Sequence, residues 1–115
     1  MTERIIIAGS GGQGIMLLGK VLAEAAMQED KFVSFLPSYG AEVRGGTCHC
    51  AVVISNKEIG SPYVDKADTL IIMNSPSLLK FKNRIKKNGL LLINSSLASK
   101  SNSKNTLILQ YPFTD

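Results

Sequence analysis

Short runs of branched apolar residues alternate with amphipathic segments along the first part of the chain. Residues 4–8, Arg-Ile-Ile-Ile-Ala, form such a run and end at a glycine, which predicts a buried strand. Residues 15–29 place apolar side chains on one stripe and polar ones opposite, which predicts a helix. Residues 31–37 predict a second strand, so the three segments together predict a β-α-β unit.

Turn signals divide the next part of the chain into further strands. Residues 47–55 predict a long strand, and the short step from there to residues 58–60 predicts a hairpin. Such a hairpin would make the sheet mixed rather than purely parallel. Residues 69–73 predict a third buried strand of the β-α type.

A second helix and two more strands complete the pattern. Ser75 is predicted as the N-cap of this helix, with Pro76 at its first position and Asn88-Gly89 as its stop. Residues 90–94 and 106–111 then predict two strands. The order of elements predicts an α/β fold, a Rossmann-like three-layer α/β/α domain with a mostly parallel, mixed sheet that takes in residues 1–115 as a single domain.

The first predicted strand leads into a G-x-G-x-x-G pattern, Gly9 to Gly14. Glycines allow a tight turn and a close approach of the backbone to an anion, and the following helix N-terminus favours negative charge. A dinucleotide site also needs an acid at the end of the second strand, but Asp30 precedes that strand, which argues against NAD. Two interpretations stay open, tight strand–helix packing without a ligand or an anion site formed by Gly9, Gly11, Gly12, Gln13 and Gly14.

A second glycine-rich loop spans residues 38–46. Arg44, followed by Gly45 and Gly46, can present a guanidinium beside open backbone N–H groups, which suits phosphate or carboxylate. The spacing alone favours a plain hairpin loop with a solvated arginine. Glu42 could act as a general base, but a surface charge beside Arg44 is the simpler interpretation.

The two cysteines flank the single histidine in Cys48-His49-Cys50. On a strand, the side chain of His49 points away from both thiols, so the three cannot hold one metal ion. Buried, reduced cysteines that pack as small apolar groups fit this pattern better. We therefore expect no metal site and no disulfide here.

Size and charge narrow the classes of function. The 115 residues are 44% hydrophobic and have no run long enough for a membrane helix. No signal-peptide pattern opens the chain, which predicts a cytoplasmic protein. The net charge of +4 comes mainly from seven cations between Lys80 and Lys104, which predict a solvated face or, alternatively, a patch for phosphates or an acidic partner. Phe81 is the only aromatic residue among these seven cations, which argues against nucleic-acid binding.

Three further blocks join the glycine turn in a resemblance to a known family. They are Leu22-Ala23-Glu24-Ala25-Ala26, the run PSYGAEVRGGTCHCAVVIS at residues 37–55, and Ile59-Gly60-Ser61-Pro62 with Ala67-Asp68. Together they resemble the gamma subunit of 2-oxoacid:ferredoxin oxidoreductases over residues 5 to about 94. Tyr39-Gly40, Glu42 and Arg44-Gly45-Gly46 look closest to the 2-oxoglutarate branch.

The resemblance implies an enzyme subunit without catalytic residues of its own. Enzymes of this family decarboxylate a 2-oxoacid on thiamine diphosphate, pass electrons through iron–sulfur clusters to ferredoxin, and form an acyl-CoA. The implied partners are alpha and beta subunits that hold thiamine diphosphate and a ferredoxin-like subunit that holds the clusters. CoA is a polyphosphate, so the turn at 9–14 and Arg44-Gly45-Gly46 become its candidate binding loops, with a subunit interface as their rival role. An independent nucleotide-binding module and a structural scaffold are the alternatives.

The resemblance also predicts how the chain ends. Family members continue past residues 106–111 into a covering helix, so we expect a C-terminally shortened form here. A bare sheet face would favour association, including a homodimer of the isolated chain.

Overall fold

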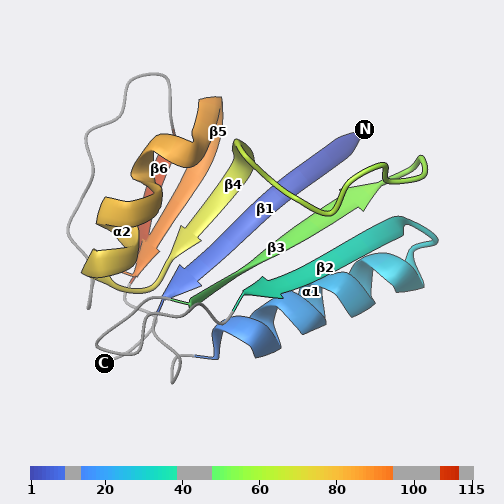
Figure 1. Cartoon of the computed structure of the whole chain (residues 1–115), viewed down its shortest axis with the longest axis horizontal. Coiled ribbons are helices and arrows are strands. Elements are labelled where there is room, and N and C mark those ends of the chain that lie inside the picture. The colour runs from blue at the N-terminus through green and yellow to red at the C-terminus, as the bar shows by residue number, and fades with distance from the viewer. Residues whose placement is uncertain (10–13, 39–47, 95–106, 112–115) are drawn as a thin grey trace.

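The computed structural model describes residues 1–9, 14–38, 48–94 and 107–111. Six strands form one mixed sheet in the order β2-β3-β1-β4-β5-β6 (Figure 1). Their bounds are β1 Thr2–Gly9, β2 Phe32–Ser38, β3 Cys48–Ser55, β4 Ala67–Ile72, β5 Ile85–Asn94 and β6 Leu107–Tyr111. β3 runs antiparallel to β1 and β2, whereas β1, β4, β5 and β6 are successively parallel. The mostly parallel, mixed sheet of the prediction is thus confirmed.

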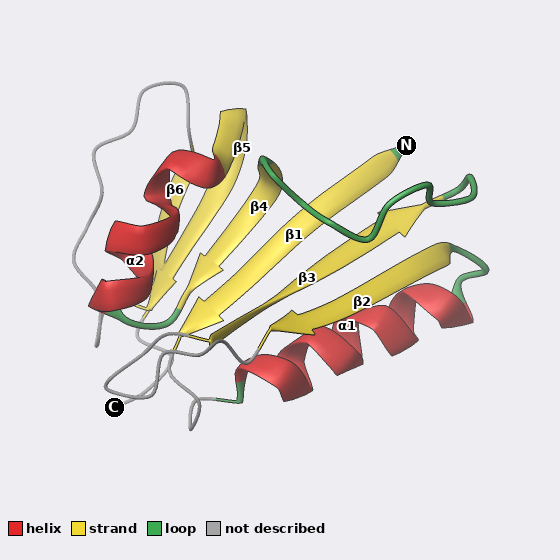
Figure 2. Cartoon of the chain, viewed as in Figure 1, coloured by secondary structure: helices red, strands yellow, loops and turns green. Residues whose placement is uncertain are grey.

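Helix α1, Ile15–Gln28, and helix α2, Ser75–Phe81, pack on opposite faces of this sheet (Figure 2). One core cluster joins α2 to Ile6 and Ala8, and the other joins α1 to Ile5 and Ile7, because successive strand residues point to opposite faces. β1 is therefore buried on both sides, as its unbroken apolar run predicts. Within the described residues no helix is long and apolar enough to span a bilayer. The complete three-layer arrangement stays a prediction.

The route to the mixed sheet differs from the expected one. The predicted hairpin between residues 47–55 and 58–60 is wrong, because residues 58–60 form no strand. Instead, β3 lies between β1 and β2, and pairs antiparallel with both. At the end of β3 the backbone N–H of Lys57 donates to Ser55 Oγ over 3.1 Å, which turns the chain out of the ladder. The loop that follows crosses in front of β1 and β3 (Figure 1).

The second helix begins and ends differently from the prediction. Its N-cap is Asn74, whose Oδ1 accepts from the Ser77 N–H at 3.0 Å, and Ser75 is the first helical residue. An extended Asn74 carries the side-chain acceptor that the N-cap position needs. The helix passes into a 3-10 turn, η2 (Lys82–Arg84), and β5 starts at Ile85. The expected stop at Asn88-Gly89 is wrong, because Asn88, at φ 66°, lies inside β5 near an irregularity in its register with β4.

Candidate functional site

The carboxyl ends of β1 and β4 meet at one edge of the sheet, because the two strands are parallel neighbours. The backbone N–H of Met73 donates to the carbonyl of Ala8 at 2.9 Å and joins the two strand ends. At this edge the chain passes from β1 to α1, which packs on one face of the sheet. It also passes from β4 to α2, which packs on the other face. Ligands of open α/β sheets bind at such a switch point, so this edge is the candidate site.

Both described ends of the glycine turn lie at this edge. Gly9 is the buried last residue of β1, and Gly14 is the exposed N-cap of α1 with a left-handed φ of 74°. No side chain caps α1 and no acidic residue lies in its first turn, so no residue of this helix neutralises the positive end of its dipole. This arrangement suits an anion. Gly11, Gly12 and Gln13 lie outside the described residues.

The conformation of Gly14 leads to a stability prediction. A Cβ added there would meet nothing within 4 Å, so Gly14→Ala has no clash and its cost is left-handed strain alone. We expect the free energy of unfolding to fall by about 1 kcal/mol. Gly14→Asn should lose less, since asparagine tolerates this region. Urea unfolding of both variants measures the difference, and an alanine variant as stable as the parent would contradict the strain argument.

The second loop starts and ends beside the first. Ser38 at the end of β2 pairs with His49, and Cys48 at the start of β3 pairs with Gly9. The predicted candidates Arg44, Gly45 and Gly46 lie outside the described residues, as does Glu42. The strand register nevertheless places Cys48 next to Gly9, and Ser38 one strand further away at the same edge of the sheet.

The Cys-His-Cys segment alternates as predicted. Both thiols are free and buried on the α1 side, and Cys50 Sγ donates to the Ile15 carbonyl at 3.7 Å. The ring of His49 lies on the other face, with its centroid 4.8 Å from that of Phe81. Across the described part of the chain, no three potential ligands gather as they would around a metal.

Burial favours the protonated, less nucleophilic form of these thiols. Desolvation, and secondarily the neighbouring Cys48, raises the pKa of Cys50 to about 12, and desolvation also raises the pKa of Cys48. A raised pKa favours the protonated thiol in the folded chain. The contribution of this thiol to the free energy of unfolding is therefore complete below its pKa in the unfolded chain, and it is lost as the pH rises through its pKa in the folded chain.

At pH 8 the thiolate fraction of Cys50 should be roughly three orders of magnitude below that of a free cysteine. We therefore expect iodoacetamide to leave Cys50 unmodified in the folded chain and to label it after urea unfolding, as read by mass spectrometry. Fast labelling of Cys50 in the folded chain would contradict its burial.

The acid that a dinucleotide site needs is missing from the described part of the edge. Asp30 lies in the turn between α1 and β2, at the amino end of β2, with φ 61°. The carboxyl ends of β1, β2 and β4 lie at the opposite edge of the sheet. The position of Asp30 agrees with the sequence argument against NAD.

Sequence reasoning missed a cavity on the α2 side of the sheet. His49, Tyr63 and Arg84 line it, from β3, the following loop and η2. Residues so far apart in the sequence form no motif, and only the basic run containing Arg84 hinted at an anion.

The fold defines an α/β protein in which Gly9 and Gly14, the described ends of the glycine segment, lie at the switch point of the sheet. The family described as pyruvate ferredoxin/flavodoxin oxidoreductase matches residues 4–114. The chain belongs to this family, as a domain of the kind found in its gamma subunits.

Two relatives show how much of the family proteins the chain covers. It is 42% identical to the ketoisovalerate oxidoreductase subunit VorA of Methanothermobacter marburgensis, over 95% of this chain and 23% of VorA. It is 37% identical to the 2-oxoglutarate synthase subunit KorC of Methanocaldococcus jannaschii, over 99% of this chain and 63% of KorC. The chain thus spans less than two thirds of either relative.

Two solved structures have a similar fold. The gamma subunit of a keto/oxoacid ferredoxin oxidoreductase from Geobacter sulfurreducens superposes with a TM-score of 0.80 at 31% identity, over 96% of this chain and 61% of that one. The 2-oxoglutarate:ferredoxin oxidoreductase from Magnetococcus marinus, solved with 2-oxoglutarate, coenzyme A and succinyl-CoA bound, gives 0.83 at 21% identity, over 96% and 20%. The second likeness shows the fold alone.

Proposed function

We propose that the chain is the gamma-type part of a cytoplasmic 2-oxoacid:ferredoxin oxidoreductase. This complex oxidatively decarboxylates a 2-oxoacid to an acyl-CoA and delivers the electrons to ferredoxin. Alpha, beta and ferredoxin-like partners hold the thiamine diphosphate and the iron–sulfur clusters. The main support for this proposal is the family match over residues 4–114. The glycine turn at the carboxyl edge of the sheet is the second observation that supports it.

The role of this chain in the complex is to bind CoA, and it contributes no catalytic residue. The phosphates of CoA lie against the turn at residues 9–14 and against Arg44-Gly45-Gly46. A helix N-terminus without a neighbouring acid supports this assignment, because it adds a favourable field to the backbone N–H donors. The Magnetococcus enzyme, whose structure has the same fold, was solved with coenzyme A bound, which makes CoA the first ligand to test.

The oxoacid that we propose first is 2-oxoglutarate, on the resemblance of the Tyr39–Gly46 block. The similarity to both KorC and VorA makes ketoisovalerate the second candidate. Substrate contacts on partner chains would decide between them. Reduction of viologen by the purified complex with 2-oxoglutarate, ketoisovalerate and pyruvate compares the three directly.

Steady-state kinetics of the assembled complex tests the role in CoA binding. Loss of a charge-assisted contact to phosphate in Arg44→Ala should raise the KM for CoA about tenfold, with a smaller change in kcat. Lys57→Ala, an exposed cation at the opposite edge, is the matched control and should leave the KM unchanged. An unchanged KM in Arg44→Ala would favour a scaffold role, and full activity without this chain would refute the proposal.

An independent nucleotide-binding module is the second candidate, favoured by the glycine pattern alone. Calorimetry of the isolated chain with NAD, FAD and CoA separates the two functions. Tight NAD binding would support the module, whereas absence of NAD binding fits the position of Asp30.

A further inference from the structure

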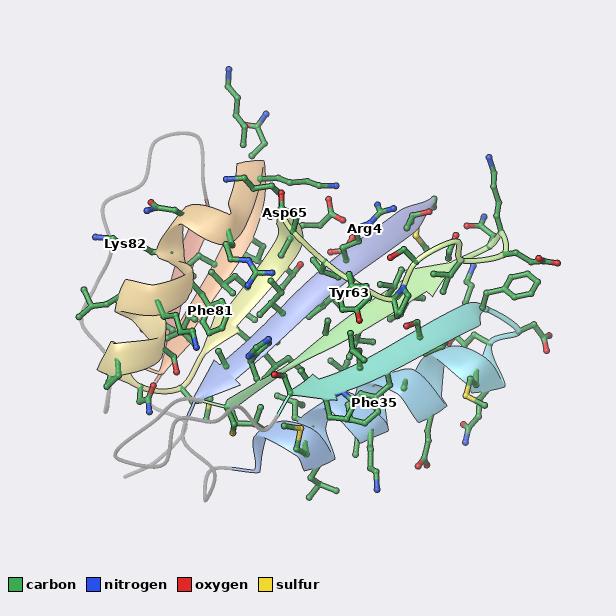
Figure 3. All side chains as sticks on the ribbon, viewed as in Figure 1. Arg4, Phe35, Tyr63, Asp65, Phe81 and Lys82 are labelled. Carbon is green, nitrogen blue, oxygen red and sulfur yellow. The ribbon has the colours of Figure 1, made fainter. Side chains whose placement is uncertain are left out.

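A cavity of about 280 Å³ lies on the α2 face of the sheet, outside the glycine turn. Its floor includes Ile6 of β1 and Ala51 of β3, which are almost completely buried. Its walls include Val64 of the crossing loop and Arg84 of η2. Figure 3 shows the loop with Tyr63 in front of the sheet, and Phe81 on the helix at the left of the same view. The cavity is thus lined by both apolar and polar side chains and has a cation in its wall.

Contacts with the protein hold this cation in place. Arg84 Nε donates to the Asp65 carbonyl at 3.1 Å, and Arg84 Nη2 donates to the Val64 carbonyl. The guanidinium carbon lies 5.3 Å from the ring centroid of the fully buried Phe81. Because the side chain is already ordered, a ligand that binds it loses little additional entropy.

Arg84 has no ion-pair partner among the described residues, although Asp65, whose carbonyl accepts from it, is an acidic neighbour. Both of its hydrogen-bond partners are neutral carbonyls, and a guanidinium has five N–H donors. The carboxylate of Asp68 is instead paired with Lys86 at 3.0 Å. The exposed Lys80 and Lys82 add to the positive potential. An anion is therefore the ligand that this wall favours.

The polar side of the cavity faces the carboxyl edge. His49 and Ser38 line it and are direct neighbours in the β2–β3 register, and His49 also pairs with Ala8, one residue before Gly9. A ligand here would lie next to the edge where the glycine turn starts. Two other cavities between described residues lack this combination: one carries Glu58 as its charged residue, and another contains both Arg4 and Glu58.

We propose that this cavity binds a compact organic anion, with its phosphate or carboxylate on Arg84 and its apolar body against Ile6 and Ala51. A volume of about 280 Å³ is at the lower end for small-molecule sites, so it fits a small metabolite or one arm of a larger ligand. Two sources share this chemistry, the phosphopantetheine arm of CoA and a free branched-chain oxoacid. The site rests on its own geometry and stands without the assignment of the glycine turn.

NMR titration of the full 115-residue chain tests the proposal, with phosphopantetheine, 3-methyl-2-oxobutanoate and inorganic phosphate as probes. We expect at least one organic probe to bind more tightly than inorganic phosphate and to shift the amide signals of Ala51, Val64 and Arg84. Phosphopantetheine binding alone would assign the site to the arm of CoA, and oxoacid binding alone to the metabolite. No binding by either organic probe at millimolar concentration would overturn the proposal, as would shifts confined to the glycine turn.

Two variants and one control locate the binding. Arg84→Met should weaken binding about tenfold or more, because it removes a charge-assisted hydrogen bond. Ala51→Ile fills the floor of the cavity but keeps Arg84, and it should abolish binding. This second variant tests the site even if Arg84→Met does not fold. Lys82→Met removes the same charge from the same turn, but Lys82 points outward in Figure 3, so its Kd should stay within about twofold. Equal losses in Lys82→Met and Arg84→Met would overturn the site.

A failure of this proposal and a failure of the proposed function can be told apart. The cavity is tested by binding to the isolated chain and by residues 51 and 84. The role in CoA binding is tested by the KM of the complex and by residue 44. An unchanged KM in Arg44→Ala leaves the cavity standing, and a cavity that binds no probe leaves the family function standing.

Discussion

Phe81→Ala is expected to lower the free energy of unfolding by about 3–5 kcal/mol. The phenyl ring is completely buried in the α2-side core and is contacted by the His49 ring and the Arg84 guanidinium. Its removal takes the largest fully buried side chain from the core and leaves a cavity under α2. Since domains are stable by only about 5–15 kcal/mol, this loss could leave the chain partly unfolded at room temperature.

A matched control lies on the same helix. Leu79 is 71% exposed, so Leu79→Ala should change stability by less than about 0.5 kcal/mol. Phe81→Leu should fall between the two, because it keeps much of the apolar volume. Urea unfolding followed by circular dichroism measures all three variants, and equal stability of Phe81→Ala and Leu79→Ala would contradict the assigned core.

Gly19→Ala is expected to destabilise the chain, although alanine is the better helix former. A Cβ at this position would lie 2.6 Å from Cys50 Sγ and 2.7 Å from Phe35 Cε1, both of which belong to the sheet. Overpacking of this kind costs about 1–3 kcal/mol, against a gain of about 1 kcal/mol in helix propensity. We expect a net loss of about 1–2 kcal/mol because the short contact to Cys50 cannot be relieved without moving α1.

Gly60→Ala is the control for this prediction. A Cβ there would meet nothing within 4 Å and its φ is not left-handed, so stability should stay within about 0.5 kcal/mol. Thermal unfolding of both variants gives the comparison. If Gly19→Ala were more stable than the parent, α1 would not lie against β3 at the described distance.

Local patterns in the sequence were enough for much of the fold. The unbroken apolar run at residues 4–8 predicted β1, because a strand buried on both faces has apolar residues at successive positions. The apolar stripe at residues 15–29 predicted α1, because a helix buried on one face repeats its apolar residues about once per turn. The alternation at Cys48, His49 and Cys50 predicted which side chains share a face. The glycine pattern predicted a turn at the start of a helix, and Gly14 has the left-handed φ that only glycine adopts readily.

Other features required the folded chain. The sequence could not show that β3 lies between β1 and β2, because strand pairing is decided by competition between segments far apart in the chain. Asn74 and Ser75 are both good capping residues, and only the backbone geometry selects Asn74.

The sequence by itself determined the class of fold, the position of the glycine turn and the family to which the chain belongs. These depend on residue type and spacing within short segments, which the chain carries before it folds. The tertiary structure alone decided the order of the strands, the switch point between β1 and β4, and the cavity that joins His49, Tyr63 and Arg84. Tertiary packing brings such distant residues together, and the local hydrophobic periodicity of the sequence does not indicate which of them will be in contact.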